Sequence, residues 1–208
     1  MPDLAWEQTL QREGYSSVAG IDEAGRGPLA GPVVAAAAIL PLSFRHSSLN
    51  DSKQLSEKKR EAIYEELKAD ERIIWNSAAV DSRQIDKINI LKATHAAMKC
   101  ATEGLSTKPD AVLIDGLEVK GFPIHQKALV KGDSISLSIA AASVIAKVER
   151  DRLMLKFAEK YPEYGFEKHK GYGTKLHLEQ LRRHGPCPIH RQSFRPVAQL
   201  SLPFDEGR

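Results

Sequence analysis

The sequence of 208 residues is 42% hydrophobic and 27% charged, which predicts one sizeable core with room for a small appended lobe. Its longest apolar run, Val33–Leu40, is far shorter than the ~20 residues that span a bilayer, so a membrane protein is excluded. The net charge of +3 is too small to indicate nucleic-acid binding, and two distant cysteines make a disulfide framework unexpected. We therefore expect a soluble, cytoplasmic protein.

Apolar runs and helical periodicity define the predicted elements in chain order. Strands at 17–22 and 33–40 flank a Gly- and Pro-rich turn and form a hairpin, and the second strand is apolar enough to be buried on both faces. After a helix capped by Ser56, we expect a strand at 72–80, a helix at 90–103, strands at 111–116 and 124–130, and a mostly buried helix following Asp133. Short helical pieces follow residue 161. This order predicts an α/β fold with a helical C-terminal extension.

Basic residues gather in the second half of the chain. Residues 168–195 contain seven Lys and Arg, four His and a single acid, Glu179. A basic C-terminal face beside an acidic N-terminal part suits a metal-assisted reaction on a polyanion. A solvated basic surface without function is the alternative, and charge alone does not decide between them.

Four acidic residues lie where an apolar strand ends or a buried helix begins: Asp22, Glu23, Asp115 and Asp133. Active sites of open α/β sheets commonly collect at such strand ends. Four converging carboxylates cannot all stay ionised without a cation, because like charges raise one another's pKa. We therefore predict a Mg²⁺ or Mn²⁺ site, with two ions ~4 Å apart that activate a water and stabilise the leaving oxygen in phosphodiester hydrolysis.

Each acid also has an ordinary structural interpretation. Asp133 can be the N-cap of the long helix, and Asp115 before Gly116 can be a turn residue. For the adjacent pair Asp22-Glu23 the ordinary interpretation is weaker, because a salt bridge to Arg26 would satisfy only one of the two carboxylates.

Beyond these single residues, the segment 20–33, GIDEAGRGPLAGPV, resembles the opening signature of type 2 ribonucleases H, the ribonuclease HII family of bacteria. The supporting matches follow in family order between about residues 18 and 197, and their joint specificity is high. They are Asp51–Ser56, Ile114–Gly116, Lys131–Asp133, Ala140–Arg152, His169–Thr174 and His190–Phe194.

The resemblance implies a ribonuclease H-like fold with a mixed central sheet flanked by helices. It implies a Mg²⁺- or Mn²⁺-dependent endonuclease that cleaves RNA paired with DNA or embedded in duplex DNA, as in ribonucleotide excision repair and removal of primer RNA. Cleavage on the 5′ side of the ribonucleotide would leave a 3′-hydroxyl and a 5′-phosphate. The metal-binding, catalytic acids of the family match Asp22, Glu23, Asp115 and Asp133.

The resemblance also implies how the substrate is recognised. The backbone of Gly25-Arg26-Gly27 would contact a 2′-hydroxyl, and Tyr172 would stack on the next sugar, where an aromatic ring disfavours a further hydroxyl. Lys53, Arg191 and Arg26 suit phosphate contacts, with surface ion pairs as the alternative. Gln54 departs from the basic residue common in the family, without touching a proposed ligand.

Two further motifs lie in the C-terminal part. His184, Cys187 and His190, with His177, have spacing that allows a zinc site, although two prolines limit local chelation and a loop is the favoured interpretation. The segment 199–204 resembles the peptide by which bacterial repair proteins bind the DNA polymerase sliding clamp, with Gln199, Leu202 and Phe204 as anchors. A segment packed on its own domain is the alternative.

The predicted organisation is a catalytic domain over 1–160, a helical substrate-binding extension over 161–197 and a tail from 198 to 208, in a monomer without membrane contact. Two other functions stay open. One is another nuclease of the same fold, such as a resolvase or transposase-like enzyme, which has no need to recognise a 2′-hydroxyl. The other is a nonenzymatic module that binds RNA–DNA hybrids and holds a structural cation. The four acids argue against such a module, because without neutralisation they would repel the phosphates of the nucleic acid.

Overall fold

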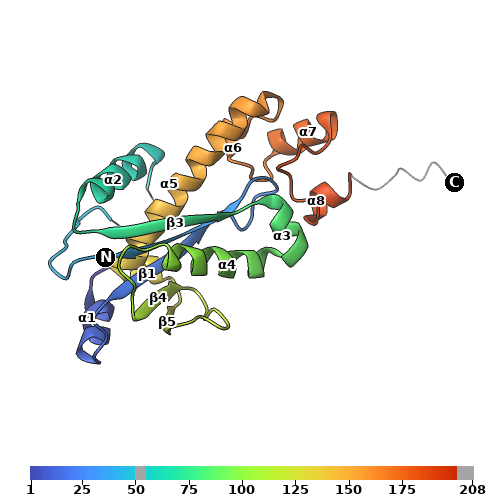
Figure 1. The fold of residues 1–208 in the computed structure, drawn as a ribbon. Helices are drawn as coiled ribbons and strands as arrows, with labels where there is room; N and C mark the ends of the chain where they lie inside the picture. The colour runs from blue at the N-terminus through green and yellow to red at the C-terminus, as the bar shows by residue number, and fades with distance from the viewer. Residues whose placement is uncertain (50–54, 201–208) are drawn as a thin grey trace.

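The computed structural model describes residues 1–49 and 55–200, built around a five-stranded mixed sheet with strand order β3-β2-β1-β4-β5 (Figure 1). β1 pairs antiparallel with β2 and parallel with β4, which in turn pairs parallel with β5, and β2 pairs antiparallel with β3. The strands are β1 (Val18–Ala24), β2 (Val33–Ile39), β3 (Ile74–Val80), β4 (Ala111–Asp115) and β5 (His125–Leu129). The predicted α/β class, mixed sheet and initial hairpin are confirmed.

The helices agree with the predicted order, with two additions that the sequence analysis missed, α1 and α3. The α-helices are α1 (Ala5–Arg12), α2 (Glu57–Ala69), α3 (Ser82–Ile88), α4 (Ile90–Glu103), α5 (Leu137–Lys160), α6 (Phe166–His169), α7 (Lys175–His184) and α8 (Arg195–Ala198). Two 3₁₀ turns, η1 (Gly132–Ser134) and η2 (Pro162–Tyr164), flank α5. As expected, the Ser56 side chain caps α2 by accepting from the backbone N–H of Lys59.

The sheet is covered on both faces. Alternate alanines of β2 point to opposite sides, so that Ala36 and Ala38 pack with α5 and α2, whereas Ala35 and Ala37 pack with α4. β2 is therefore buried on both faces, as its unbroken apolar sequence predicted. At Gly20, a Cβ would lie 2.1 Å from the carbonyl carbon of Ser138, so only glycine lets the start of α5 come this close to β1.

The segment after α5 forms a small helical unit with its own apolar cluster, which includes Phe166, Cys187 and Ile189 together with Met154 of α5. It joins the loop before β2 through backbone hydrogen bonds, such as that from the N–H of Gly31 to the carbonyl of Ile189 (2.8 Å). The helical extension was predicted, and its division from a catalytic domain stays a prediction. Within the described ranges, none of the helices has the length and apolar content needed to cross a membrane.

Candidate metal centre

Three of the four predicted acids meet at the ends of β1 and β4. One carboxylate oxygen each from Asp22, Asp115 and Asp133 lies within 4.8 Å of the other two. The parallel register pairs Ile21 with Ile114, so the next residue on each strand is an aspartate of this cluster. The backbone N–H of Gly132 donates to Oδ1 of Asp115 (2.7 Å) and so ties β4 to the turn that carries Asp133.

The cluster is electrostatically strained in a way that a cation would relieve. Burial raises the pKa of Asp22 well above its ordinary value, and the charges of Glu23 and Asp115 raise it further. Hydrogen bonds from Ser143 and from the backbone N–H of Glu23 (2.7 Å) offset this only in part. An all-oxygen donor set with this excess of negative charge fits Mg²⁺ or Mn²⁺.

Glu23 occupies a different place from the three aspartates. Its Oε1 forms an ion pair with Nη1 of Arg26 (3.2 Å), and its charge acts on Asp22. The salt bridge considered from the sequence is therefore present, and Arg26 pairs with Glu23 rather than with Asp22. Glu23 nevertheless lines the same pocket as Asp22 and Asp115, a cavity of about 210 Å³.

The structure separates the ordinary and functional interpretations of Asp133. The N-cap of α5 is Ser136, whose hydroxyl accepts from the N–H of Ile139 (3.1 Å), so the interpretation of Asp133 as the cap is wrong. Asp133 lies instead in η1, with its residue surface only 4% exposed. Its burial beside two other carboxylates would be costly without a neutralising cation, which makes Asp133 a candidate metal ligand.

The glycine-rich loop and Tyr172 line the same pocket as the acids. The lining residues are Asp22, Glu23, Ala24, Gly25, Arg26, Gly27, Asp115, Ser143, Lys147 and Tyr172. Tyr172 is 43% exposed, and Nζ of Lys147 lies 5.9 Å from its ring centroid. Ser143 and Lys147 were not singled out from the sequence, although their spacing of four residues places both on one face of α5.

Two buried arginines hold the glycine-rich loop from behind. Gly25 has φ +95°, and a Cβ there would lie 2.0 Å from Nε of Arg150. The guanidinium of Arg191 donates to the carbonyls of Gly25 (2.5 Å), Arg26 (2.9 Å) and Gly31 (3.0 Å). Arg191 has no exposed surface, so the phosphate contact expected from the sequence is not open to it in this structure. Its role here is to fix the loop.

Of the other predicted substrate and partner residues, the two that the structure describes are exposed. The side chain of Arg26 is 52% exposed at the pocket rim. Gln199 is exposed just after α8. Lys53, Leu202 and Phe204 lie outside the described residues.

The zinc alternative finds no support in the described part of the chain, where the three aspartates are the one group of His, Cys, Asp and Glu residues with metal-ligand geometry. His177 and His190 are buried and hydrogen-bonded to each other, whereas His184 is exposed. Cys187 is buried and Cys100 exposed, and both are free thiols.

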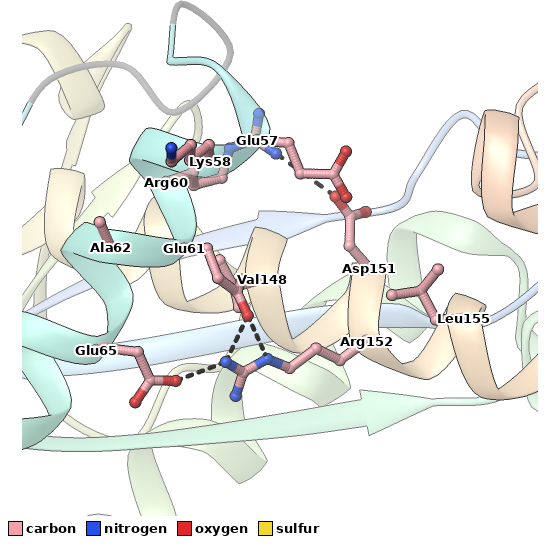
Figure 2. Close-up of a pocket in the computed structure, with 10 residues that line it drawn as sticks. All are labelled: Glu57, Lys58, Arg60, Glu61, Ala62, Glu65, Val148, Asp151, Arg152 and Leu155. Carbon is pink, nitrogen blue, oxygen red and sulfur yellow. Dashed lines mark hydrogen bonds and ion pairs between the residues drawn. The ribbon is translucent and has the colours of Figure 1, made fainter.

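A larger groove, of about 700 Å³, lies between α2 and α5. Figure 2 shows its side chains: Arg152 of α5 reaches across to Glu61 and Glu65 of α2, and Arg60 approaches Asp151. Asp151 also accepts from Nζ of Lys147 (2.6 Å), so this ion-pair network extends to the acid pocket. The groove itself contains none of the three clustered aspartates.

Comparison with known proteins identifies related chains. A sequence model of the Ribonuclease HII family matches residues 19–197. A protein from Desulfitobacterium hafniense (strain DSM 10664 / DCB-2), Ribonuclease HII, is 54% identical over 196 residues, which are 94% of this chain and 75% of the relative.

Two solved structures with 28% sequence identity share the fold. Ribonuclease H2 from Pyrococcus horikoshii OT3 has a TM-score of 0.74, with 88% of this chain and 96% of that chain covered. The second structure is a PCNA:RNase HII complex from Archaeoglobus fulgidus, with a TM-score of 0.71 and coverage of 89% and 97%.

Proposed function

The chain belongs to the ribonuclease HII family, and from this membership and its acid pocket we propose that it hydrolyses the phosphodiester 5′ to ribonucleotides in duplex DNA or RNA–DNA hybrids. The products would carry a 3′-hydroxyl and a 5′-phosphate. The reaction would serve ribonucleotide removal and degradation of primer RNA. The observation that carries the proposal is the clustering of three aspartates, of which Asp22 and Asp133 are buried and Asp115 half-buried, beside a pocket lined by a glycine-rich loop and an exposed tyrosine.

Asp22, Asp115 and Asp133 would hold the catalytic Mg²⁺ or Mn²⁺, with Glu23 completing the donor set at the rim. When bound, two such ions would supply an activated water and stabilise the leaving oxygen. The aspartates orient their oxygens through strand register and the hydrogen bond from Gly132 to Asp115. Lys147, partly buried and paired with Asp151, lines the same pocket and would bring an ammonium group close to a bound phosphate.

Recognition of the ribonucleotide would come from the Gly25-Arg26-Gly27 loop and Tyr172. A Cβ at Gly27 would meet nothing within 4 Å, so the loop offers open space for close approach of a sugar. Arg191 fixes the loop through the carbonyls of Gly25 and Arg26. The exposed ring of Tyr172 provides an apolar surface for the following deoxyribose.

The test is cleavage of a labelled duplex that carries a single ribonucleotide, in Mg²⁺ or Mn²⁺, with the cut position and end groups mapped. We expect one cut on the 5′ side of the ribonucleotide, and we expect Asp22→Asn to abolish turnover while leaving substrate binding largely intact. Equal cleavage of an all-DNA duplex would refute the proposal in favour of a resolvase- or transposase-like nuclease. Binding without cleavage by the wild-type protein would indicate a nonenzymatic hybrid-binding module.

The segment 199–204 is the proposed contact with the DNA polymerase sliding clamp through Gln199, Leu202 and Phe204. The similar RNase HII from Archaeoglobus fulgidus was solved in complex with PCNA, which supports the class of partner but not this segment. A peptide of residues 196–208 should bind the clamp at tens of micromolar or better, and Leu202→Ala with Phe204→Ala should remove that binding. We also propose a cytoplasmic monomer, consistent with free cysteines.

A further inference from the structure

Three buried histidines form a cluster behind Tyr172. His169, His177 and His190 are only 7%, 0% and 2% exposed. The rings of His169 and His177 are stacked with centroids 4.5 Å apart. The three residues lie outside the set that lines the acid pocket, and the proposed hydrolysis assigns them no role.

The hydrogen-bond partners determine one protonation pattern along His190 and His177, with the hydrogens assigned from the positions of the heavy atoms. The backbone N–H of Cys187 donates to Nδ1 of His190 (2.9 Å), so a neutral His190 carries its proton on Nε2. That Nε2 lies 3.0 Å from Nε2 of His177, which must accept the bond. His177 therefore carries its proton on Nδ1 and donates it to the carbonyl oxygen of Tyr172 (2.9 Å).

The backbone of Tyr172 is held from the interior by this and two other hydrogen bonds. The N–H of Thr174 donates to the same carbonyl (2.8 Å), and the N–H of Tyr172 donates to the carbonyl of His169 (2.9 Å). The Tyr172 ring meanwhile lies in the acid pocket, with the guanidinium of Arg150 5.8 Å from its centroid. The buried histidines thus act on the backbone of the residue whose ring faces the site.

We propose that His177, oriented by His190, is a positioning residue that fixes Tyr172 beside the aspartates and so sets the preference for a ribonucleotide followed by DNA. This inference rests on the proposed function, in which Tyr172 stacks on the sugar after the ribonucleotide. The pathway from Cys187 through His190 and His177 to Tyr172 is hereafter called the histidine relay.

The relay requires both rings to be neutral. A second proton on His177 would place a donor against the Nε2–H of His190, and a second proton on His190 would place a donor against the N–H of Cys187. Burial lowers the pKa of both His177 and His190 to about 4, reinforced by the charge of His169 at His177 and by the charges of His177 and His169 at His190.

The other titratable or charged groups around the relay do not supply either ring with a carboxylate partner among the described hydrogen bonds. These groups are Glu163, Tyr164, Glu167, Lys168, His169, Lys170 and His184. The relay should therefore stay intact throughout the neutral pH range.

The first test is a ¹⁵N NMR measurement of the histidine rings in the full-length protein, which needs no activity. We expect the Nδ1–H tautomer for His177 and the Nε2–H tautomer for His190 at pH 7. Both rings should stay neutral until the pH approaches 4, where the Tyr172 amide signal should shift with them. His177 found protonated, or with its proton on Nε2, at pH 7 would overturn the relay.

The second test measures junction preference, defined as kcat/KM for a single-ribonucleotide duplex divided by kcat/KM for a uniform RNA–DNA hybrid. His177→Ala should lower this ratio by about five- to tenfold, the range of one lost hydrogen bond. His177→Asn, whose amide can still donate to Tyr172, should restore it to within about twofold. The exposed His184→Ala is the matched control and should change nothing.

A double-mutant cycle separates positioning from a general structural effect. In a Tyr172→Ala background, His177→Ala should cause no further loss of junction preference, because its effect passes through Tyr172. Multiplicative losses, or an asparagine variant as impaired as the alanine variant, would overturn the proposal. If His177→Ala fails to fold, His177→Asn and His190→Ala provide the same comparison. A wild-type protein that cleaves neither substrate would refute the proposed function. The NMR measurement would still decide whether the histidine relay has the expected tautomers, because it does not depend on activity.

Discussion

Replacing Asp22 by Asn should stabilise the metal-free protein while it abolishes turnover. The pKa of Asp22 is raised by burial and then by Glu23 and Asp115, so ionising this carboxyl costs the folded state free energy that the unfolded chain does not lose. Each unit by which the pKa rises costs about 1.4 kcal/mol. For a chain of this size 1 kcal/mol corresponds to roughly 2–4 °C in Tm. Even a rise of one unit in the pKa of Asp22 therefore predicts that the Tm of Asp22→Asn exceeds that of the wild type by about 3–6 °C at pH 8 in the presence of a chelator.

The pH dependence of this gain follows from the sign of the pKa change. Below the unfolded pKa near 3.8 the carboxyl is protonated in both states, so the gain should shrink as the pH is lowered towards 4 and be complete above the folded pKa. The side-chain amide of the Asp22→Asn variant can still accept from the N–H of Glu23, which preserves the local hydrogen bond. Differential scanning calorimetry of both proteins from pH 4 to 8 makes the measurement.

The matched control is Asp110→Asn, because Asp110 accepts hydrogen bonds from the backbone N–H groups of Ser16 (2.8 Å) and Ser17 (3.0 Å) at a half-buried position outside the acid cluster. Burial is the largest single influence on Asp110 and raises its pKa, but the hydrogen bonds from Ser16 and Ser17 together outweigh it and lower the pKa, so replacing Asp110 should not raise Tm. Mg²⁺ or Mn²⁺ should stabilise the wild-type protein and leave Asp22→Asn nearly unchanged. An Asp22→Asn variant with a Tm equal to or below that of the wild type at pH 8 without metal would refute the electrostatic reasoning.

Three further predictions concern the packing around the site. Gly20→Ala should lower the free energy of unfolding by about 3 kcal/mol in urea titrations, because its Cβ would lie 2.1 Å from backbone of Ser138, and an unchanged midpoint would contradict this close approach. Arg191→Met should lower the free energy of unfolding by about 3 kcal/mol, since three loop carbonyls lose their buried donor. It should also reduce the discrimination between ribonucleotide-containing and all-DNA duplexes. Full discrimination by the folded variant would show that the loop keeps its shape without Arg191. In an Asp22→Asn background, Tm should fall as the pH is lowered from 6.5 to 4, because His177 and His190 take up protons at a higher pH in the unfolded chain than in the folded protein. Adding His177→Asn should make Tm depend less steeply on pH, and an unchanged slope would contradict the lowered pKa of His177.

Much of the fold could be predicted from local patterns. The eight-residue apolar run at Val33–Leu40 predicted a strand buried on both faces, and alternate alanines of β2 do face the two layers of helices. The serine cap of α2 and the periodic segment of α4 were also confirmed. The helix α3 was missed although Asp81 caps it by accepting from the N–H of Gln84 (2.8 Å), a signal present in the sequence.

The start of α5 and the role of Arg191 depended on tertiary contacts. Asp133 and Ser136 are both acceptable caps by residue type. In the structure Ser136 accepts from the N–H of Ile139, and its hydroxyl donates to Oε1 of the distant Glu7 (2.6 Å), a contact that fixes the serine as the cap. Arg191 lies in a basic segment that suggested phosphate binding. Its burial against the carbonyls of a loop some 160 residues earlier could not be read from its neighbours in the chain.

The sequence by itself determined the family and the α/β class, because these follow from motif order and periodicity, and its resemblance to the family predicts Asp22, Glu23, Asp115 and Asp133 as the metal-binding acids. Only the tertiary structure decided that Asp22, Asp115 and Asp133 converge while Glu23 pairs with Arg26. It also decided that His177, hydrogen-bonded to the distant His190, reaches the backbone carbonyl of Tyr172. The reason is physical: proximity, burial and the direction of a hydrogen bond arise when distant segments pack together, and no single segment contains them.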